Sequence, residues 1–289
     1  MKQKAGNPLV SVIIPARNEE ENIARLLQSI KNQTYKNIET IVIDDASSDR
    51  TVEIARRHTP HVFQRSFSER SIQRNFGAKI SKGKYLVFLD ADMELGKCVI
   101  GDCLKQIGLA NFRALTIPEK TVGQSFIAKI RNFEREMYMG EFSFEVPRFF
   151  EKKAFWEYGG YDPKLTGPED YDLPYRLSKK YKIARSSKYI FHHEENLSLK
   201  KLLWKKYYYA KNGAFYAVKH PKMVWVQGTI LFRKVYLKNW KKFVKNPIYG
   251  VSFIFVRFLE TLYALAGFIS AVGISGLIKT LVRSIKYER

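Results

Sequence analysis

Short apolar runs alternate with segments of helical period along the N-terminal part of the chain. The runs predicted to be buried strands are Leu9–Ile14, Ile38–Ile43 and Tyr85–Leu89, with a weaker strand at His61–Arg65. Helices are expected at residues 19–30, where apolar residues keep helical spacing, and at residues 51–58 and 70–80. Strands that alternate with helices in this way predict a parallel sheet, whose ligands bind beyond the carboxyl ends of the strands.

The alternation is less regular downstream, although the segments still belong to one α/β domain. Strands are expected at residues 114–117, 146–150 and 183–191, and helices at 124–139, through Phe155 and from Glu169. Cys98 and Cys103 lie in one further predicted helix, at a spacing that fits neither a disulfide framework nor a zinc knuckle. The pattern predicts an α/β domain over residues 1–195 and a separate helical region over residues 196–289.

The helical region contains an unusually apolar stretch. Thr261–Ile278 is free of charged residues and would span about 27 Å as a helix, close to the thickness of a membrane core. An extended membrane-associating segment at about residues 249–278 includes Arg257 and Glu260, which lie three apart and are expected to pair. Because both flanks are basic, a tilted span, a re-entrant segment and an in-plane helix all stay open, as does a buried core helix.

Charge is distributed very unevenly. The chain has 50 Lys and Arg but 28 Asp and Glu, a formal net charge of +22, which calls for an anionic partner. Residues 196–246 hold 13 Lys or Arg and no acidic residue, interleaved with aromatic side chains that include Trp204, Trp225 and Trp240. This mixture is typical of a membrane-facing surface, and with the apolar run it favours lipid over nucleic acid as the partner. No apolar signal-peptide core follows Met1, so we expect a cell-membrane location with the catalytic domain cytoplasmic.

Two acidic residues follow the strand that ends at Leu89. Asp90 and Asp92 flank one small residue, so in an extended conformation both carboxylates point to the same side. Hard oxygen ligands in that arrangement suit Mg²⁺ or Mn²⁺ bridging to a diphosphate. An Asp-x-Asp pattern alone is weak, because acidic residues at strand ends commonly cap or solvate the chain.

Four segments together resemble the inverting glycosyltransferases of family 2, which have the GT-A fold. They are VSVIIPARNEEENIARLLQSIKNQ, IETIVIDDASSDRT, RNFGAKISKGKYLVFLDAD and GGYDPKLTGPEDYDLPYRLSKK, in the family's order and within residues 9–195. The resemblance implies a Rossmann-like, mostly parallel nucleotide-sugar-binding domain. It also implies a UDP- or GDP-linked sugar as donor.

The same resemblance implies roles for individual residues. The positions matched to nucleotide-sugar binding are Pro15, Ala16, Arg17, Glu19, Asp44, Asp45, Arg74, Asp90, Ala91 and Glu169. For Asp44, capping of the next helix is an equal alternative, and Arg74 is expected near phosphate.

The metal ligands implied by the resemblance are Asp92 and Asp90, with His192 or His193 as a further candidate. Asp170, of the Glu-Asp pair, is the implied base that deprotonates the acceptor hydroxyl. Three acidic residues fall within Glu169–Asp172, which a helix-start carboxylate alone does not explain, and Asp172 is expected to pair with Arg176.

The sequence departs from the processive members of the family in one motif, and two other functions compete with glycosyl transfer. The region SLKKLLWKKYYYAKNG lacks the Gln-x-x-Arg-Trp motif of processive synthases, so we expect transfer of one sugar at a time. A nucleotidyltransferase is disfavoured because PARNEEEN has no glycine and three consecutive acids. An inactive GT-A-like scaffold that binds membrane or nucleic acid remains the alternative to a transfer onto a membrane lipid, a lipid-linked glycan or a polyprenyl phosphate.

Overall fold

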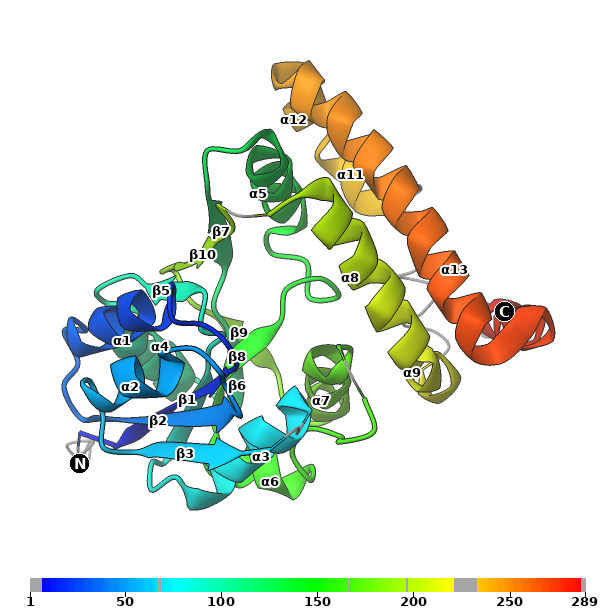
Figure 1. The fold of residues 1–289 in the computed structure, drawn as a ribbon. Coiled ribbons are helices and arrows are strands. Elements are labelled where there is room, and N and C mark those ends of the chain that lie inside the picture. The colour runs from blue at the N-terminus through cyan, green and yellow to red at the C-terminus, as the bar shows by residue number, and fades with distance from the viewer. Residues whose placement is uncertain (1–6, 67–68, 166, 196, 221–232, 287–289) are drawn as a thin grey trace. The chain divides into compact units, whose positions relative to one another are not determined.

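The computed structural model describes residues 7–66, 69–165, 167–195, 197–220 and 233–286, so Trp225 lies outside the described residues (Figure 1). The chain forms two compact units. The first comprises Met1–Glu119, Val146–Pro163 and Asp170–His193, and the second comprises Lys120–Glu145, Lys164–Glu169 and Glu194–Arg289. Part of the second unit therefore comes from the middle of the sequence.

The first unit is built on a seven-stranded sheet, in the order β3-β2-β1-β4-β8-β6-β9. Its strands are β1 (Val10–Ala16), β2 (Ile38–Asp45), β3 (Val62–Arg65), β4 (Tyr85–Phe88), β6 (Ala114–Thr116), β8 (Pro147–Glu151) and β9 (Ile183–Arg185). Neighbouring strands are parallel except where β8 pairs with β4 and with β6. The mostly parallel α/β sheet expected from the sequence is thus confirmed.

Helices cover both faces of this sheet because successive residues of β1 point to opposite sides. Val10, Val12 and Ile14 pack into a core with residues of three helices on one face, whereas Ile13 belongs to the core on the other face. The helices of the first face are α1 (Ile23–Lys31), α2 (Thr51–Arg56) and α4 (Val99–Gly108). Those of the other are α3 (Arg70–Ile80), α6 (Lys152–Glu157) and α7 (Glu169–Ser178).

A second, three-stranded sheet has the order β5-β10-β7 and was not expected. Its strands are β5 (Met93–Leu95), β10 (Ile190–His193) and β7 (Glu119–Val122). The single strand predicted at residues 183–191 is wrong, because β9 and β10 are separated by a turn. Asp102 on α4 holds that turn, since its carboxylate accepts hydrogen bonds from the Ser186 hydroxyl at 2.6 Å and the Ser187 amide at 2.9 Å.

The second unit is mainly helical. Its helices are α5 (Phe126–Tyr138), α8 (Leu199–Asn212), α9 (Ala214–Lys219), α11 (Lys234–Lys238), α12 (Trp240–Lys245) and α13 (Pro247–Lys286). In Figure 1, α8 runs beside α13, and Gly267 lies so near the Tyr207 carbonyl that a side chain there would clash. Gly273, at φ 70°, interrupts α13 with a non-helical conformation that glycine adopts readily.

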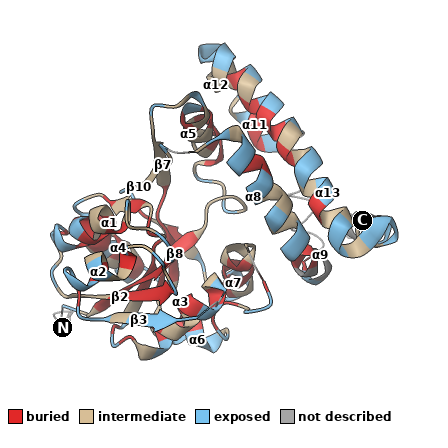
Figure 2. Ribbon diagram, viewed as in Figure 1, coloured by how far each residue is buried: buried red, intermediate tan, exposed pale blue. Residues whose placement is uncertain are grey.

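Within α13, the expected Arg257–Glu260 ion pair is confirmed. Pro247–Thr280 is the one helix of the described chain that is long and apolar enough to cross a membrane. Only 6% of its most apolar window is buried, whereas the core helix of a soluble protein is mostly buried, and much of α13 is coloured as exposed in Figure 2.

Candidate active site

The residues predicted to bind the donor gather where β1, β2 and β4 end. β1 and β2 are level at this edge, with Ala16 opposite Asp44, and Asp90 comes two residues after the last residue of β4. Pro15 and Ala16 lie in β1 itself, and Ala91 is 3% exposed. The sheet therefore brings the predicted positions of three separate segments to its carboxyl edge, where open α/β sheets bind ligands.

Hydrogen bonds between side chains and backbone join the loops after β1 and β2. The Asn18 amide donates to the Ser47 hydroxyl at 2.9 Å, and the Asn18 side-chain oxygen accepts from the Ser48 amide at 2.9 Å. Asn18 and Ala46 both have φ 52°, a left-handed conformation that is costly for alanine. The two loops are thus held in a fixed shape before any ligand arrives.

Asp44 and Asp45 have different surroundings. Asp44 is fully buried and accepts a hydrogen bond from the Ser47 amide at 3.1 Å, so it shapes the turn after β2. The carboxylate of Asp45 lies 3.6 Å from the guanidinium of Arg17, whose side chain is half exposed. Asp45, unlike Asp44, therefore has a partner, Arg17, whose exposed side chain can reorient toward a ligand.

Arg74 joins two carboxylates that are far apart in sequence. It is completely buried, and its guanidinium donates to Asp90 at 2.7 Å and to Asp170 at 2.7 Å. Burial would raise the pKa of Asp90, but Arg74 and then Arg148 hold that pKa well below its usual range. Arg74 thus bridges two carboxylates in this structure, and its expected place near phosphate stays a prediction.

The buried Arg148 and the partly buried Glu119 extend this arrangement, and neither was predicted from the sequence as a site residue. Arg148 on β8 lies 3.5 Å from Asp90 and donates to Glu119 at 2.6 Å. Glu119 in turn lies 3.3 Å from His192. The sequence signal for Arg148 is that it is a lone charge in the predicted strand at residues 146–150, since such a charge must be paired when buried.

The two adjacent histidines point to different partners. His192 Nε2 lies 2.9 Å from Asp92 Oδ2, and His193 Nε2 lies 2.9 Å from Glu94. They alternate because both belong to β10. The structure thus places the imidazole of His192, but not that of His193, next to the carboxylate of the predicted metal ligand Asp92.

Asp92 has one carboxylate oxygen that suits a divalent cation. Its Oδ1 atom is buried and accepts no hydrogen bond from the described residues, whereas Oδ2 is bonded to His192. No set of three His, Cys, Asp or Glu side chains in the described chain is already grouped for a metal. A lone hard oxygen with an imidazole beside it fits Mg²⁺ or Mn²⁺ whose other ligands come from a diphosphate and water.

Glu19 faces the same edge. Its pKa is raised, first by burial and then by the negative charges of Asp92 and Asp90. Its carboxylate accepts a hydrogen bond from Asn22 at 2.9 Å. A cation bound among these acids would relieve their repulsion.

The helix α7 begins with the predicted Glu-Asp pair. Glu169 is buried, and Asp170 has 17% of its side chain exposed, so a substrate can reach it. The expected pair of Asp172 and Arg176 is confirmed at 2.7 Å, and Arg176 also donates to the carbonyl of Gly160. α7 is therefore fixed to the loop before it, which holds Asp170 in place.

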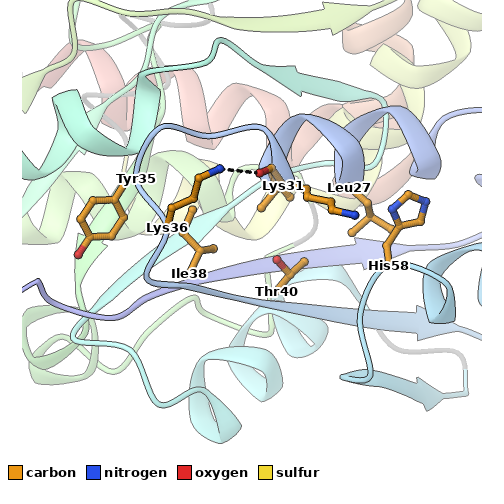
Figure 3. Close-up of a pocket in the computed structure, with 8 residues that line it drawn as sticks. Leu27, Lys31, Tyr35, Lys36, Ile38, Thr40 and His58 are labelled. Atoms are coloured by element: carbon orange, nitrogen blue, oxygen red, sulfur yellow. Dashed lines mark hydrogen bonds between the residues drawn. The ribbon is translucent and has the colours of Figure 1, made fainter.

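A pocket of about 230 Å³ lies between α1 and β2, away from this edge (Figure 3). Tyr35, Lys36, Ile38 and His58 are among its lining residues, and Ile38 is the first residue of β2, at the opposite end from Asp45. The lining contains no carboxylate, so it does not offer the hard oxygen ligands that a divalent cation requires.

Comparison with known proteins identifies the class of this fold and then the family. Mannosyltransferase PcManGT from Pyrobaculum calidifontis, in complex with GDP-Man and Mn²⁺, superposes with a TM-score of 0.58 at 15% identity, over 96% of this chain and 80% of that chain. S. aureus TarS 1–349 in complex with UDP-GlcNAc gives a TM-score of 0.57 at 17% identity, over 91% and 89%. At such identities the likeness concerns the fold, which is GT-A.

Residues 11–155 match the glycosyl transferase family 2 profile, and the chain belongs to that family. Hyaluronan synthase of Pasteurella multocida is 30% identical over 209 residues, 68% of this chain and 22% of the synthase. The chain spans about a quarter of the length of this and two other curated relatives, a 4,4'-diaponeurosporenoate glycosyltransferase of Staphylococcus haemolyticus and a glycosyltransferase of Escherichia coli.

Proposed function

We propose that the protein catalyses a metal-dependent, inverting and non-processive transfer of a sugar from a UDP- or GDP-linked donor. The acceptor would lie at the cytoplasmic membrane surface, and a lipid-linked glycan or a polyprenyl phosphate suits this location. The observation that carries the proposal is the single hydrogen-bonded connection from Asp170 through Arg74 to Asp90 at the carboxyl edge of the sheet. Family membership makes glycosyl transfer the reaction to test first.

Asp170 is proposed as the base. For a glycan acceptor, the Asp170 carboxylate would take the proton of the acceptor hydroxyl while that oxygen forms a bond to the anomeric carbon. The bond from the same carbon to the diphosphate oxygen breaks, the nucleoside diphosphate leaves with the electron pair, and the configuration inverts. Arg74 donates a hydrogen bond to the Asp170 carboxylate at 2.7 Å and so holds the proposed base in position.

The donor would bind at the loops after β1 and β2. Asp45 and Arg17 are proposed to contact the nucleoside, with Pro15, Ala16, Glu19 and Ala91 shaping the site. The residues proposed to hold a divalent ion are Asp92 and Asp90, with His192 beside Asp92 at 2.9 Å. Such an ion, when bound, would neutralise the charge that develops on the departing diphosphate.

A nucleotide-binding screen followed by a transfer assay tests this function. The thermal stability of the protein would be measured with each nucleoside diphosphate, with and without Mn²⁺, because a ligand that binds only the native state raises its apparent stability. We expect UDP or GDP to stabilise the protein only when metal is present. Donor hydrolysis and transfer would then be assayed with the sugar nucleotides of the base that binds.

The outcomes separate the proposed enzyme from the inactive scaffold. Stabilisation by one nucleotide together with metal-dependent release of that nucleotide from its sugar supports the enzyme. Absence of binding, hydrolysis and transfer with every donor tested, with Mn²⁺ present, would favour the scaffold instead. Repeated addition of sugars to one acceptor would contradict the non-processive part of the proposal.

A further inference from the structure

One side of α13 is a continuous apolar surface that no part of the described chain covers. Six residues at alternating spacings of three and four form this surface, which is called the outer face of α13. They are Ile248, Val251, Phe255, Phe258, Leu262 and Leu265, and between 41% and 73% of each is exposed. Ile254, at 37% exposure, widens the surface beyond the narrow seam of a coiled coil.

The opposite side of α13 is buried in the second unit. Phe253 and Val256 pack with Phe133 and Met137 of α5 in one apolar cluster. Beside them, Arg257 lies 2.6 Å from Glu134 on α5 and pairs with Glu260, which is fully buried. Arg257 and Glu260, the two charged residues between Pro247 and Ile278, therefore point into the protein and leave the outer face uncharged.

This packing is incompatible with a helix that crosses a bilayer. α8 lies along α13, with Gly267 against Tyr207, and it carries exposed Lys200, Lys201, Lys205 and Lys211. If α13 crossed a membrane in this arrangement, α8 and its lysines would enter the hydrocarbon, where charged side chains are strongly unfavourable. An in-plane position keeps α8 in water and lets only the outer face of α13 meet lipid.

The surroundings of the outer face favour an anionic bilayer over a second copy of the chain. α12, which directly precedes α13, exposes Trp240 and Val244 together with Lys241 and Lys245. Tryptophan and lysine are typical of the interface between headgroups and acyl chains. A second copy would place these lysines near the same lysines, and residues 196–246 contain no acidic residue to compensate.

We propose that α13 lies in the plane of an anionic membrane surface, with its outer face among the acyl chains, and does not cross the membrane. This inference refines the membrane location within the proposed function. It is tested by membrane binding and topology and needs no transfer assay. The inference can therefore fail while glycosyl transfer is confirmed, and glycosyl transfer can fail while the inference is confirmed.

The first experiment is flotation with vesicles of phosphatidylcholine, with and without phosphatidylglycerol. The full chain is expected to float with the anionic vesicles and to bind them less at high salt. Phe255→Asp with Phe258→Asp should weaken that binding by at least about tenfold, because two apolar contacts are replaced by charge. Leu109→Asp is the matched control, since Leu109 is 67% exposed on the first unit, and it should bind as the unchanged protein does.

Circular dichroism of the double variant establishes that it folds. Equal vesicle binding by a folded double variant and the unchanged protein would overturn the proposal. The proposal would also be overturned if the unchanged protein formed a stable dimer without lipid and the double variant did not, because the outer face would then be a protein interface.

The second experiment distinguishes the in-plane arrangement from a span and leaves the outer face intact. Cys98 is exposed in the first unit, whereas Cys103 is buried, and burial raises the pKa of its thiol and keeps it unreactive. In sealed membrane vesicles, a membrane-impermeant maleimide would be applied to the natural protein and to Cys98→Ser combined with Lys279→Cys. The in-plane arrangement predicts that both cysteines label from the same side. Labelling of one from outside and of the other only after detergent would show that α13 crosses the membrane.

Discussion

The buried guanidinium of Arg74 donates one hydrogen bond to Asp90 and one to Asp170, each at 2.7 Å. The proposed base and one proposed metal ligand are therefore held by the same side chain. Arg148 continues the connection from Asp90 to Glu119, and Glu119 leads to His192 beside Asp92. Negative and positive groups alternate from Asp170 through Arg74, Asp90 and Arg148 to Glu119, so both buried guanidinium groups have partners of opposite sign.

Asp170→Asn tests the proposed base. Asparagine keeps the size of the side chain and can still accept the hydrogen bond from Arg74, but it cannot take a proton. We expect the turnover number to fall by about 10²–10⁴-fold, with little change in the Kd of the nucleoside diphosphate. Initial rates at saturating donor and calorimetric titration measure the two effects. The control is Glu157→Gln, because Glu157 pairs with Lys180 on the surface. Normal turnover of the Asp170→Asn enzyme would show that Asp170 is not the base.

Arg74→Lys tests the bridge between the two carboxylates. An ammonium is a compact point charge and cannot reproduce two hydrogen bonds of a planar guanidinium. Loss of one charged hydrogen bond of about 1.5–3 kcal/mol should lower turnover by about one to two orders of magnitude. Because both partners are protein carboxylates, the Kd of the nucleotide should change less than the rate. A large loss of nucleotide affinity with normal turnover would instead indicate that Arg74 contacts the phosphate. Arg113→Lys is the control, because Arg113 forms a partly exposed ion pair with Glu151.

Three strands of the large sheet could be predicted because each is a largely buried parallel strand that needs a continuous apolar run. β1, β2 and β4 show this run, and their ends carry the polar residues that the parallel topology brings together. The strands of the small sheet, such as β5 and β7, have only three and four residues. Such segments are too short to show a period and form through pairing with distant strands.

The charge network was predicted only in part because its members meet through tertiary structure. The resemblance to a family supplied Asp90, Asp92 and Asp170, but it did not indicate that Arg74 joins two of them. Arg148 lies 58 positions from Asp90 in the sequence. Which of the two histidines faces Asp92 depends on the register of β10 against β5, where His192 pairs with Met93. Register is a property of the folded sheet that alternation along one strand does not determine.

The adjacent histidines allow a matched test of the metal site. His192 contacts Asp92, whereas His193 contacts Glu94. His192→Gln should weaken Mn²⁺ affinity by about 10–100-fold, because the orientation of a ligand depends on its hydrogen-bond partner. The Mn²⁺ concentration that gives half of the nucleotide-induced thermal stabilisation is the measurement. His193→Gln should raise this Mn²⁺ concentration much less than His192→Gln does. A larger effect of His193→Gln would indicate that the metal site lies beside Glu94.

Glu134 makes the stability of the second unit depend on pH in a definite direction. Burial opposes its ionisation, but Arg131 and Arg257 lower its pKa from 4.5 to about 2. A carboxyl whose pKa is lower in the folded state stabilises the protein above its unfolded pKa and loses that contribution as pH falls through the folded value. Glu134→Gln should therefore lower the free energy of unfolding by about 3–5 kcal/mol at pH 7, the typical cost of breaking a buried ion pair.

Urea unfolding at a series of pH values measures this difference, which should narrow as the pH falls from 4.5 toward 2 because the natural side chain is then protonated too. Glu141→Gln is the control. Glu141 pairs with Lys238, whose side chain is 71% exposed, so its removal should cost at most about 1 kcal/mol. A difference for Glu134→Gln that stays constant from pH 7 to pH 2 would show that the lost stability comes from packing and that the charge of Glu134 contributes little. The ion pair with Arg257 could then not be what fixes the inner side of α13 to α5.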